Sequence, residues 1–522
     1  LRQADAFTIH ANGTVAVDAE TTILMNAGQA DGVAIQGTAI GAGAVEVYDI
    51  DSKTGADLSA VDLDLTIDLE SDGRASDILL GADANIDVAD GKTLTVTSDG
   101  GATDVLDVTA ATFEVSDANG NAGAVTVEID TKVKMTTAQA AGHKIDGAGE
   151  TYLDASDAKN SAVITVPSDQ ANYDVANLYL DINIGGVEKR FTIYGGAQEA
   201  RTPGEIATKI VNVLAGQPDI NATANGLEVV VSSSKSLNVK GFDWVGTERA
   251  LVDNLTINHG VINDDLSKVD TDLTIDLGSE DAALTSAGNI DVADGKTLTV
   301  TSDSGATDVL DVTAGTFAVS TANGNAGAVL VEADTTLKMT AAQAAGHSVT
   351  GAGSVDVVDI ESTLGADLSA IDTDLTIDLE SDGRDSDIVL SSAKIDIADG
   401  KTLTVTSDAG GPDVLNVTGA TFEVSDASGN EGAVVVEADT KLKMTAGQAT
   451  GHAVTGAGSV DVVDIGSKTD ADLSAIDTDL TIDLEADGRN GDILLGSAAN
   501  IDVAGGKTLT VTSANDGTDD VL

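Results

Sequence analysis

"GKTLTVTS" at residues 91–98 is the strongest indication of the fold, because the same eight residues return at 295–302, 400–407 and 506–513. After its first three residues the stretch alternates apolar and polar side chains, which is typical of a half-buried β-strand. Gly-Lys-Thr also occurs in phosphate-binding loops, but such a loop needs a glycine five residues earlier and a helix afterwards. Here the residue five places earlier is an isoleucine in all four copies. The octapeptide is therefore interpreted as a structural repeat.

The spacing of the copies gives a repeat period near 105 residues. Successive octapeptides are 204, 105 and 106 residues apart, and Lys-Met-Thr at Lys134, Lys338 and Lys443 steps by 204 and then 105. The long first interval indicates an insertion. We predict a repeat region at 1–150, an inserted domain at 151–263, repeat units at 264–365 and 366–470, and a partial unit at 471–522.

Short alternating runs bounded by Gly, Asp, Asn or Ser fill each unit and predict an all-β fold. Two architectures fit the period: a repeat β-solenoid (parallel β-helix), or tandem β-sandwich repeats. Sandwiches of the immunoglobulin type use aromatic core residues, whereas these repeats contain no Trp and almost no Pro. We favour the β-solenoid, with roughly five turns of about 20 residues per unit.

The charge of the chain restricts its partners. Lys and Arg number 26 against 87 Asp and Glu, a net charge of −61, which disfavours nucleic acid and anionic membranes. The absence of cysteine excludes disulfides and thiolate metal sites, and no apolar run is long enough to insert into a bilayer. Leu1 at the start, without a signal segment, suggests a processed or excised chain. We expect surroundings rich in salt or calcium, or else a merely solubilising surface.

Clusters of acidic residues recur at equivalent positions of two units. Stacked turns would bring such carboxylates close together, where they recruit a cation or share a solvated acidic face. Calcium is the one cofactor expected. The candidate ligands are Asp62, Asp64, Asp68, Glu70 and Asp72, and in the later copy Asp372, Asp374, Asp378, Glu380 and Asp382.

The insertion has the composition of a separate globular domain, with seven of the chain's twelve aromatic residues. "LYLDINIGGVEKRFTIY" at 178–194 predicts a hairpin. The following "RTPGEIATKIVNVLAG" predicts a helix, capped by Thr202 with Glu205 completing the capping box. A strand at 226–233 completes a small α+β domain of ββαβ order.

Four aromatic residues of the insertion are candidates for contacts with a glycan or a cell-surface receptor. They are Phe242, Trp244, Tyr194 and Tyr173. The alternative is that these rings form the hydrophobic core of the domain. Phe242 and Trp244 lie between glycine and charged residues, which favours their exposure.

"NIDVADGKTLTV" at 289–300 and "LKMTAAQAAGHSVTGAGSVDV" at 337–357 resemble the strand repeats of large secreted bacterial surface proteins, including autotransporter-like β-helices and repetitive adhesins. The resemblance covers the chain outside the insertion, and the insertion resembles modules of flagellin outer regions and phage tail proteins. The resemblance of the repeats implies an extracellular or cell-surface location, a fibrous or adhesive role and no catalysis. The calcium-binding nonapeptide of repeat toxins is absent.

The two ends of the sequence are in phase with each other. Leu522 aligns with Leu106 and Phe7 aligns with Phe113, so the beginning continues the repeat near the point where the end stops. Either the chain is one segment of a longer array, or separate chains meet end to end. We predict a structural protein that forms a surface filament, sheath or adhesin rod by head-to-tail stacking. The alternatives are an adhesin stalk whose insertion binds a ligand, and a polysaccharide-degrading β-helix like those of phage tailspikes.

Overall fold

A computed structural model gives the fold of the chain in two compact units, Leu1–Ser320 and Thr321–Leu522. The structure describes residues 13–38, 42–69, 77–98, 103–116, 122–155, 161–167, 173–175, 177–184, 187–195, 199–215, 217, 220–233, 237–245, 256–279, 281–303, 307–321, 326–379, 387–407, 413–425, 431–484, 493–513 and 522.

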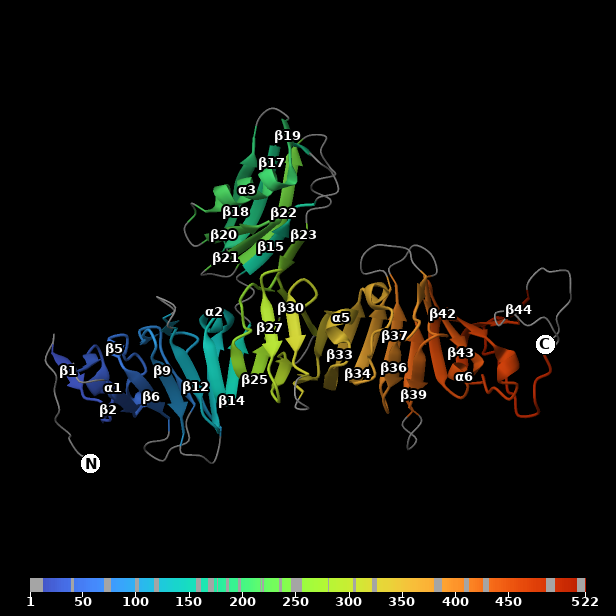
Figure 1. The fold of residues 1–522 in the computed structure, drawn as a ribbon. Coiled ribbons are helices and arrows are strands. Elements are labelled where there is room, and N and C mark those ends of the chain that lie inside the picture. Colours follow the sequence, from blue (N-terminus) through green and yellow to red (C-terminus); the bar gives the residue numbers. More distant parts are fainter. Residues whose placement is uncertain are drawn as a thin grey trace. The chain divides into compact units, whose positions relative to one another are not determined.

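The first unit is mainly a solenoid of parallel strands, as predicted. β9 pairs with β6 on one side and with β12 on the other, and β14 continues the series to β25 (Figure 1). The solenoid elements of this unit are β1 (Thr14–Val17), β2 (Thr22–Asn26), α1 (Ala27–Ala30), β3 (Ala34–Gly37), β4 (Ala44–Tyr48), η1 (Ile50–Lys53), β5 (Val61–Asp62), β6 (Asp64–Asp68), β7 (Ile78–Leu79), β8 (Asn85–Val88), β9 (Thr93–Thr97), β10 (Asp104–Asp107), β11 (Thr112–Val115), β12 (Ala124–Val127), β13 (Thr131–Thr136), α2 (Thr137–Ala140), β14 (Lys144–Asp154), β24 (Val261–Ile262), β25 (Val269–Asp276), β26 (Ala282–Leu284), β27 (Asn289–Val292), β28 (Thr297–Thr301), β29 (Asp308–Asp311) and β30 (Thr316–Val319).

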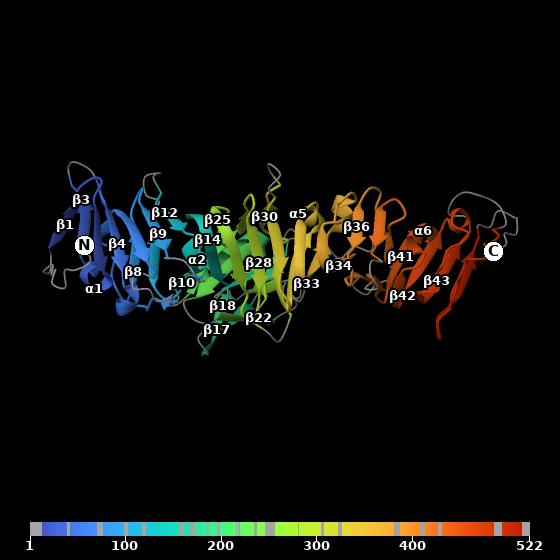
Figure 2. The same ribbon diagram turned by 90° about the horizontal axis from the view of Figure 1, so that it is seen from below.

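The second unit repeats this pattern. Figure 2 shows β41, β42 and β43 side by side, and their pairing is parallel. Its elements are β31 (Ala328–Val331), β32 (Thr335–Thr340), α5 (Ala341–Ala344), β33 (Ser348–Val358), η5 (Ile360–Thr363), β34 (Ile371–Asp378), β35 (Ile388–Val389), β36 (Lys394–Ile397), β37 (Thr402–Thr406), β38 (Asp413–Asn416), β39 (Thr421–Val424), β40 (Ala433–Val436), β41 (Thr440–Thr445), α6 (Ala446–Ala449), β42 (Ala453–Val463), η7 (Ile465–Ser467), β43 (Ile476–Asp483) and β44 (Leu509–Thr512).

Each repeat makes four turns, so the prediction of five turns of about 20 residues is wrong. Leu375 pairs with Leu403, Leu403 with Val434, Val434 with Val454, and Val454 with Ile476, at sequence separations of 28, 31, 20 and 22 residues. The long turns consist of three strands, such as β34, β35 and β36. The shorter turns replace the third strand by a single helical turn, α6 or η7.

The octapeptide forms a strand with its apolar residues inside. Leu94, Val96, Leu403 and Val405 have no exposed surface, and the threonines between them face outward with partial exposure. Parallel stacking places the same residue types above one another, for example Leu375 on Leu403. Leucine, isoleucine and valine therefore form a continuous core with few aromatic residues.

One-turn helices close the shorter turns and explain the repeated Met-Thr-x-x-Gln. In α2, Thr136 accepts a hydrogen bond from the N–H of Gln139 at 3.2 Å, and the Gln139 side chain accepts one from Thr136 at 2.9 Å. Nε2 of Gln139 also donates to the carbonyls of Val108 and Ala111, at 2.9 and 3.0 Å. The glutamine of the capping box therefore also links its own turn to a neighbouring turn.

The Gly-Ala-Gly sequence marks the bend of the longest strands. In β33 the pairing register shifts between Thr350 and Ser354, where the strand passes from β31 to β32. Gly351 has φ +129°, and a Cβ placed on it would lie 2.0 Å from the carbonyl oxygen of Val331. A Cβ on Gly353 would lie 2.3 Å from the carbonyl oxygen of Glu332. Glycine is therefore required because the neighbouring turn is too close for any side chain.

The insertion has its own core and antiparallel sheets. Its described elements run from Ser161 to His259, whereas Thr151–Asp154 of β14 and the strand β24 pair with solenoid strands, so it is narrower than 151–263. The predicted ββαβ order is present as β17, β18, α3 and β21, with further strands added. The elements are β15 (Ser161–Thr165), β16 (Tyr173–Val175), β17 (Asn177–Ile184), β18 (Val187–Tyr194), β19 (Glu199–Arg201), α3 (Pro203–Leu214), β20 (Ile220–Asn225), β21 (Glu228–Ser233), β22 (Leu237–Val245) and β23 (Thr256–His259).

The helix α3 has the capping that the sequence predicts. Thr202 accepts from the N–H of Glu205, Pro203 occupies the first helical position, and the Glu205 side chain accepts from the N–H of Thr202. Ile206, Ile210 and Leu214 are buried in the core that α3 shares with the sheets. Among the described helices, none is long and apolar enough to cross a membrane.

Candidate functional site

Two of the predicted calcium ligands are exposed and form hydrogen bonds between neighbouring turns of the solenoid. Oδ1 of Asp64 accepts from the backbone N–H of Thr93 at 3.0 Å, and Oδ1 of Asp374 accepts from the N–H of Thr402 at 2.8 Å. In both cases the donor is the first threonine of the octapeptide. These carboxylates therefore hold the octapeptide strand in register with the preceding turn.

The remaining predicted ligands do not meet in a described cluster. Asp62 and Asp372 are exposed, and Asp68 and Asp378 at the ends of their strands are half-buried. In the described ranges, no group of three or more His, Asp or Glu side chains is arranged to hold a metal ion. The other candidates lie outside the described residues: Glu70, Asp72, Glu380 and Asp382. Calcium binding stays a prediction.

The lysine of the octapeptide bonds to the glycine bend of another turn. Nζ of Lys401 donates to the carbonyl of Gly351 at 2.9 Å, and Nζ of Lys296 donates to that of Gly147 at 2.8 Å. The pair Lys507 and Gly456 repeats the contact at 2.9 Å. Gly-Lys-Thr therefore connects turns of the solenoid. The glycine turns the chain, the lysine side chain donates to a backbone carbonyl, and the threonine N–H donates to an aspartate carboxylate.

The predicted aromatic contact residues lie in different environments. The side chain of Tyr173 is 2% exposed and its hydroxyl donates to the carbonyl of Pro167 at 3.2 Å, so this residue belongs to the core. Phe242 and Trp244 lie on β22, beside Leu180 and Leu178 of β17, but their side chains are outside the described part of the structure. Tyr194 is half-buried and lines a pocket.

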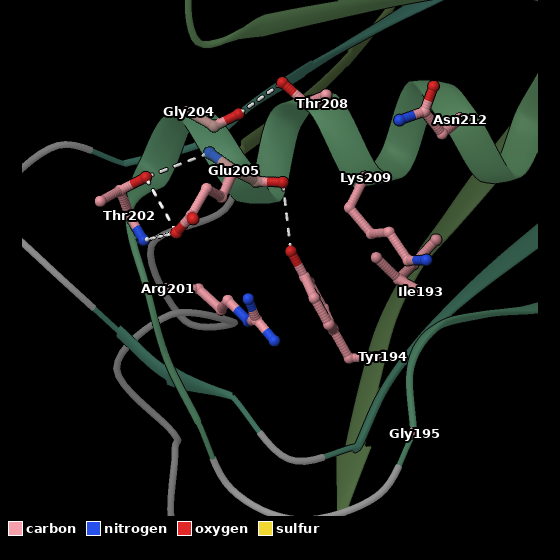
Figure 3. Close-up of a pocket in the computed structure, with 10 residues that line it drawn as sticks. All are labelled: Ile193, Tyr194, Gly195, Arg201, Thr202, Gly204, Glu205, Thr208, Lys209 and Asn212. Carbon is pink, nitrogen blue, oxygen red and sulfur yellow. Dashed lines mark hydrogen bonds between the residues drawn. The ribbon is translucent and has the colours of Figure 1, made fainter.

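This pocket is the candidate binding site of the insertion. It is an open hollow of about 760 Å³ between the end of β18 and the polar face of α3 (Figure 3). The lining residues are Ile193, Tyr194, Gly195, Arg201, Thr202, Gly204, Glu205, Thr208, Lys209 and Asn212. Such a volume accommodates a ligand of a few sugar rings or a short peptide.

Hydrogen bonds fix the frame of the pocket. The Tyr194 hydroxyl donates to the carbonyl of Glu205 at 3.1 Å, and burial raises the pKa of Tyr194 above its ordinary value. The N–H of Thr202 donates to the Glu205 carboxylate at 2.9 Å and lowers the pKa of that carboxyl. The Glu205 carboxylate is therefore already hydrogen-bonded as part of the helix cap.

Two cationic side chains, Arg201 and Lys209, give the pocket its chemical character. The Arg201 guanidinium lies 5.6 Å from the centre of the Tyr194 ring, a cation–π distance. In Figure 3 the Lys209 side chain extends from α3 on the other side of this ring. A pair of cations beside an aromatic ring suits a ligand that combines an anionic group with an apolar face.

Sequence reasoning found Tyr194 but missed the polar residues around it. Glu205, Thr208, Lys209 and Asn212 are spaced as one helix face, which was visible in the sequence because they follow the i, i+3, i+4, i+7 pattern. Arg201 precedes the cap of that helix. No local signal, however, indicated that the end of β18 lies against this face.

These features define the class of the protein: an all-β parallel solenoid built from repeats, carrying an inserted α+β domain with a cationic pocket. No protein-family model, no curated protein and no solved structure matches the chain.

Proposed function

We propose that this chain is an extracellular structural protein that forms a surface filament, sheath or adhesin by head-to-tail stacking of its solenoid turns. Its recurring polar residues support the proposal, because Asp374, Lys401 and Gln448 all form hydrogen bonds to the backbone of other turns. Repeated contacts of this kind hold successive turns together, as a structural scaffold requires. The strongly acidic surface suits salty or calcium-containing surroundings outside the cell.

The observation that carries the proposal is the incomplete core of the last described turn. Val511 is 45% exposed, whereas the equivalent Val96, Val300 and Val405 are fully buried. Val503 is 43% exposed, and its counterpart Val88 is 4% exposed. An exposed strand edge with apolar side chains is a surface for pairing with a further strand.

Electron microscopy of the purified chain, with calcium and then with a chelator, tests this function. We expect filaments that carry the insertion as regular side projections. Loss of filaments on chelation would support the predicted calcium ligands, and filaments that persist would remove calcium from the proposal. Particles that remain single in every ionic condition would contradict the structural role.

The pocket favours a second function, recognition of a carboxylated oligosaccharide by the insertion. Carboxylates of different sugar rings can pair with Arg201 and with Lys209, and the apolar face of a sugar can pack on Ile193 and Tyr194. Thr208 and Asn212 supply hydrogen-bonding groups for hydroxyls. The solenoid would then display a binding domain at a surface.

Replacement of Arg201 or Lys209 by Gln is expected to weaken binding of an oligogalacturonate about tenfold or more, because each change removes a charge-assisted contact. Titration calorimetry on the full chain measures the effect. Lys189→Gln is the matched control: it makes the same charge change in the insertion, at a residue outside the pocket lining. Equal losses in all three variants would indicate a general charge effect and contradict the site, as would binding that is unchanged in R201Q.

A further inference from the structure

Asn-x-Thr, the acceptor motif of N-linked glycosylation, occurs four times in the sequence. The motifs begin at Asn12, Asn221, Asn254 and Asn416, and none has proline in the middle position. Asn12 and Asn254 lie outside the described residues. The motifs at Asn221 and Asn416 are described, and a glycan can be attached there only if the asparagine lies at the surface.

The first described motif lies on an edge strand of the insertion. β20 is the outermost strand of its sheet and pairs with β21. Alternation along β20 buries Ala222, which is 7% exposed, and leaves Asn221 and Thr223 exposed on the other face. The asparagine amide and the threonine hydroxyl are therefore accessible from the same side of the strand.

The second described motif forms a tight turn at the end of β38. Oδ1 of Asn416 accepts hydrogen bonds from the N–H of Thr418 at 3.1 Å and from its hydroxyl at 2.7 Å. Val417 is fully buried, whereas Asn416 and Thr418 are partly exposed. Among the described residues no hydrogen bond engages Nδ2 of Asn416. The nitrogen to which a sugar would be attached is therefore available.

The fold does not require asparagine at this turn. Asp107 and Asp311 occupy the equivalent position in two other repeats, and each carboxylate accepts the same two hydrogen bonds from the threonine two residues later. Aspartate and asparagine both supply the acceptor oxygen, but only asparagine has an amide nitrogen. Asn416 thus keeps the turn and adds the one group that glycosylation needs.

An exposed apolar side chain lies beside Asn416. Val389 of β35 pairs with Asn416 in parallel register and is 49% exposed. Paired residues of parallel strands project from the same face of the sheet. A sugar on Asn416 can place the apolar face of its ring on Val389 and keep its hydroxyl groups in water. The glycan would cover an apolar side chain that the solenoid leaves in solvent.

We propose that Asn221 and Asn416 carry N-linked glycans. The donor is an oligosaccharide joined through its first carbon to a polyprenyl phosphate. Nδ2 of the asparagine forms a bond to that carbon while the bond from the carbon to the phosphate oxygen breaks, so the polyprenyl phosphate leaves and the amide loses one proton. Such motifs are modified in secreted proteins, so the inference rests on the proposed extracellular function and adds two modified residues to it.

Peptide mass spectrometry of the full chain, isolated from the surface or medium of the cells that produce it, tests the assignment. Trypsin releases Asn221 in peptide 210–235 and Asn416 in peptide 402–441. We expect fragments that place a sugar on these two asparagines, while the other asparagines of the same peptides stay unmodified. Unmodified peptides would overturn the proposal and leave the structural function intact, whereas a chain found only inside the cells would refute both.

Three variants made in the same cells separate the motif from the fold. Asn416→Asp keeps the acceptor oxygen of the turn, as in Asp107, and is expected to lose the glycan. Thr418→Ser keeps the hydroxyl and is expected to retain it. Asp107→Asn completes a motif with Thr109 in the same kind of turn and is expected to gain a glycan. A sugar that persists in peptide 402–441 of N416D, or a D107N chain without an added glycan, would overturn the role assigned to this turn.

Discussion

Gly351→Ala is expected to lower the free energy of unfolding of the second unit by about 3 kcal/mol or more. The new Cβ would lie 2.0 Å from the carbonyl oxygen of Val331, which belongs to the paired strand β31. A backbone atom in a paired strand cannot move away as a flexible side chain can. The collision is therefore relieved only by breaking the pairing of β31 with β33, and the carbonyl that Lys401 binds is displaced with it.

Gly346→Ala separates this collision from the cost of the backbone conformation. Gly346 also has a positive φ, +77°, but nothing lies within 4 Å of a Cβ placed there. We expect a loss of about 1 kcal/mol for this control. Urea denaturation of the full chain, with hydrogen exchange of the peptides covering 328–358, measures both variants. Equal losses would show that the close approach of the turns does not determine the requirement for glycine.

Leu403→Ala is expected to cost about 2–5 kcal/mol, because it opens a cavity in a fully buried layer of the core. Leu509 occupies the same position of an identical octapeptide, but it is partly exposed in the last turn. There the same substitution is expected to cost less than about 1 kcal/mol. L403A and L509A change the same residue of the same octapeptide. They differ in the next turn, which covers Leu403 but leaves Leu509 partly exposed.

Urea denaturation of the full chain compares the two leucine variants. A similar cost for L403A and L509A would mean that the last turn is covered in solution, and would contradict the incomplete core at β44.

The repeat spacing and the local alternation were sufficient to predict the solenoid. The alternation is a local signal, as in "TLTVT", and the structure contains it as a strand with its apolar residues buried. The helix cap formed by Thr202 and Glu205 is a local signal of the same kind, and it is present in the insertion. The number of turns was wrong because the sequence does not show which strands share a turn. α6 and η7 replace a strand in some turns but not in others.

The chemistry of the repeated polar residues could not be read from the sequence, because their partners are distant along the chain. Lys401 lies 50 residues from Gly351, and Asp374 lies 28 from Thr402. A row of aspartates has the same composition whether it binds cations or backbone N–H groups. For the same reason Tyr173 and Tyr194 looked alike in the sequence, although one is in the core and the other lines a pocket.

The attachment of the insertion determines how the chain would respond to mechanical tension. β14 and β25 pair directly at seven positions, from Ile145 with Val269 to Asp154 with Asp276, although the insertion separates them in sequence. The entry and exit strands of the insertion, β15 and β23, are paired with each other, with Ala162 beside His259. A pull transmitted between β14 and β25 therefore passes through their own hydrogen bonds and bypasses the insertion, which can remain folded while the scaffold is under load.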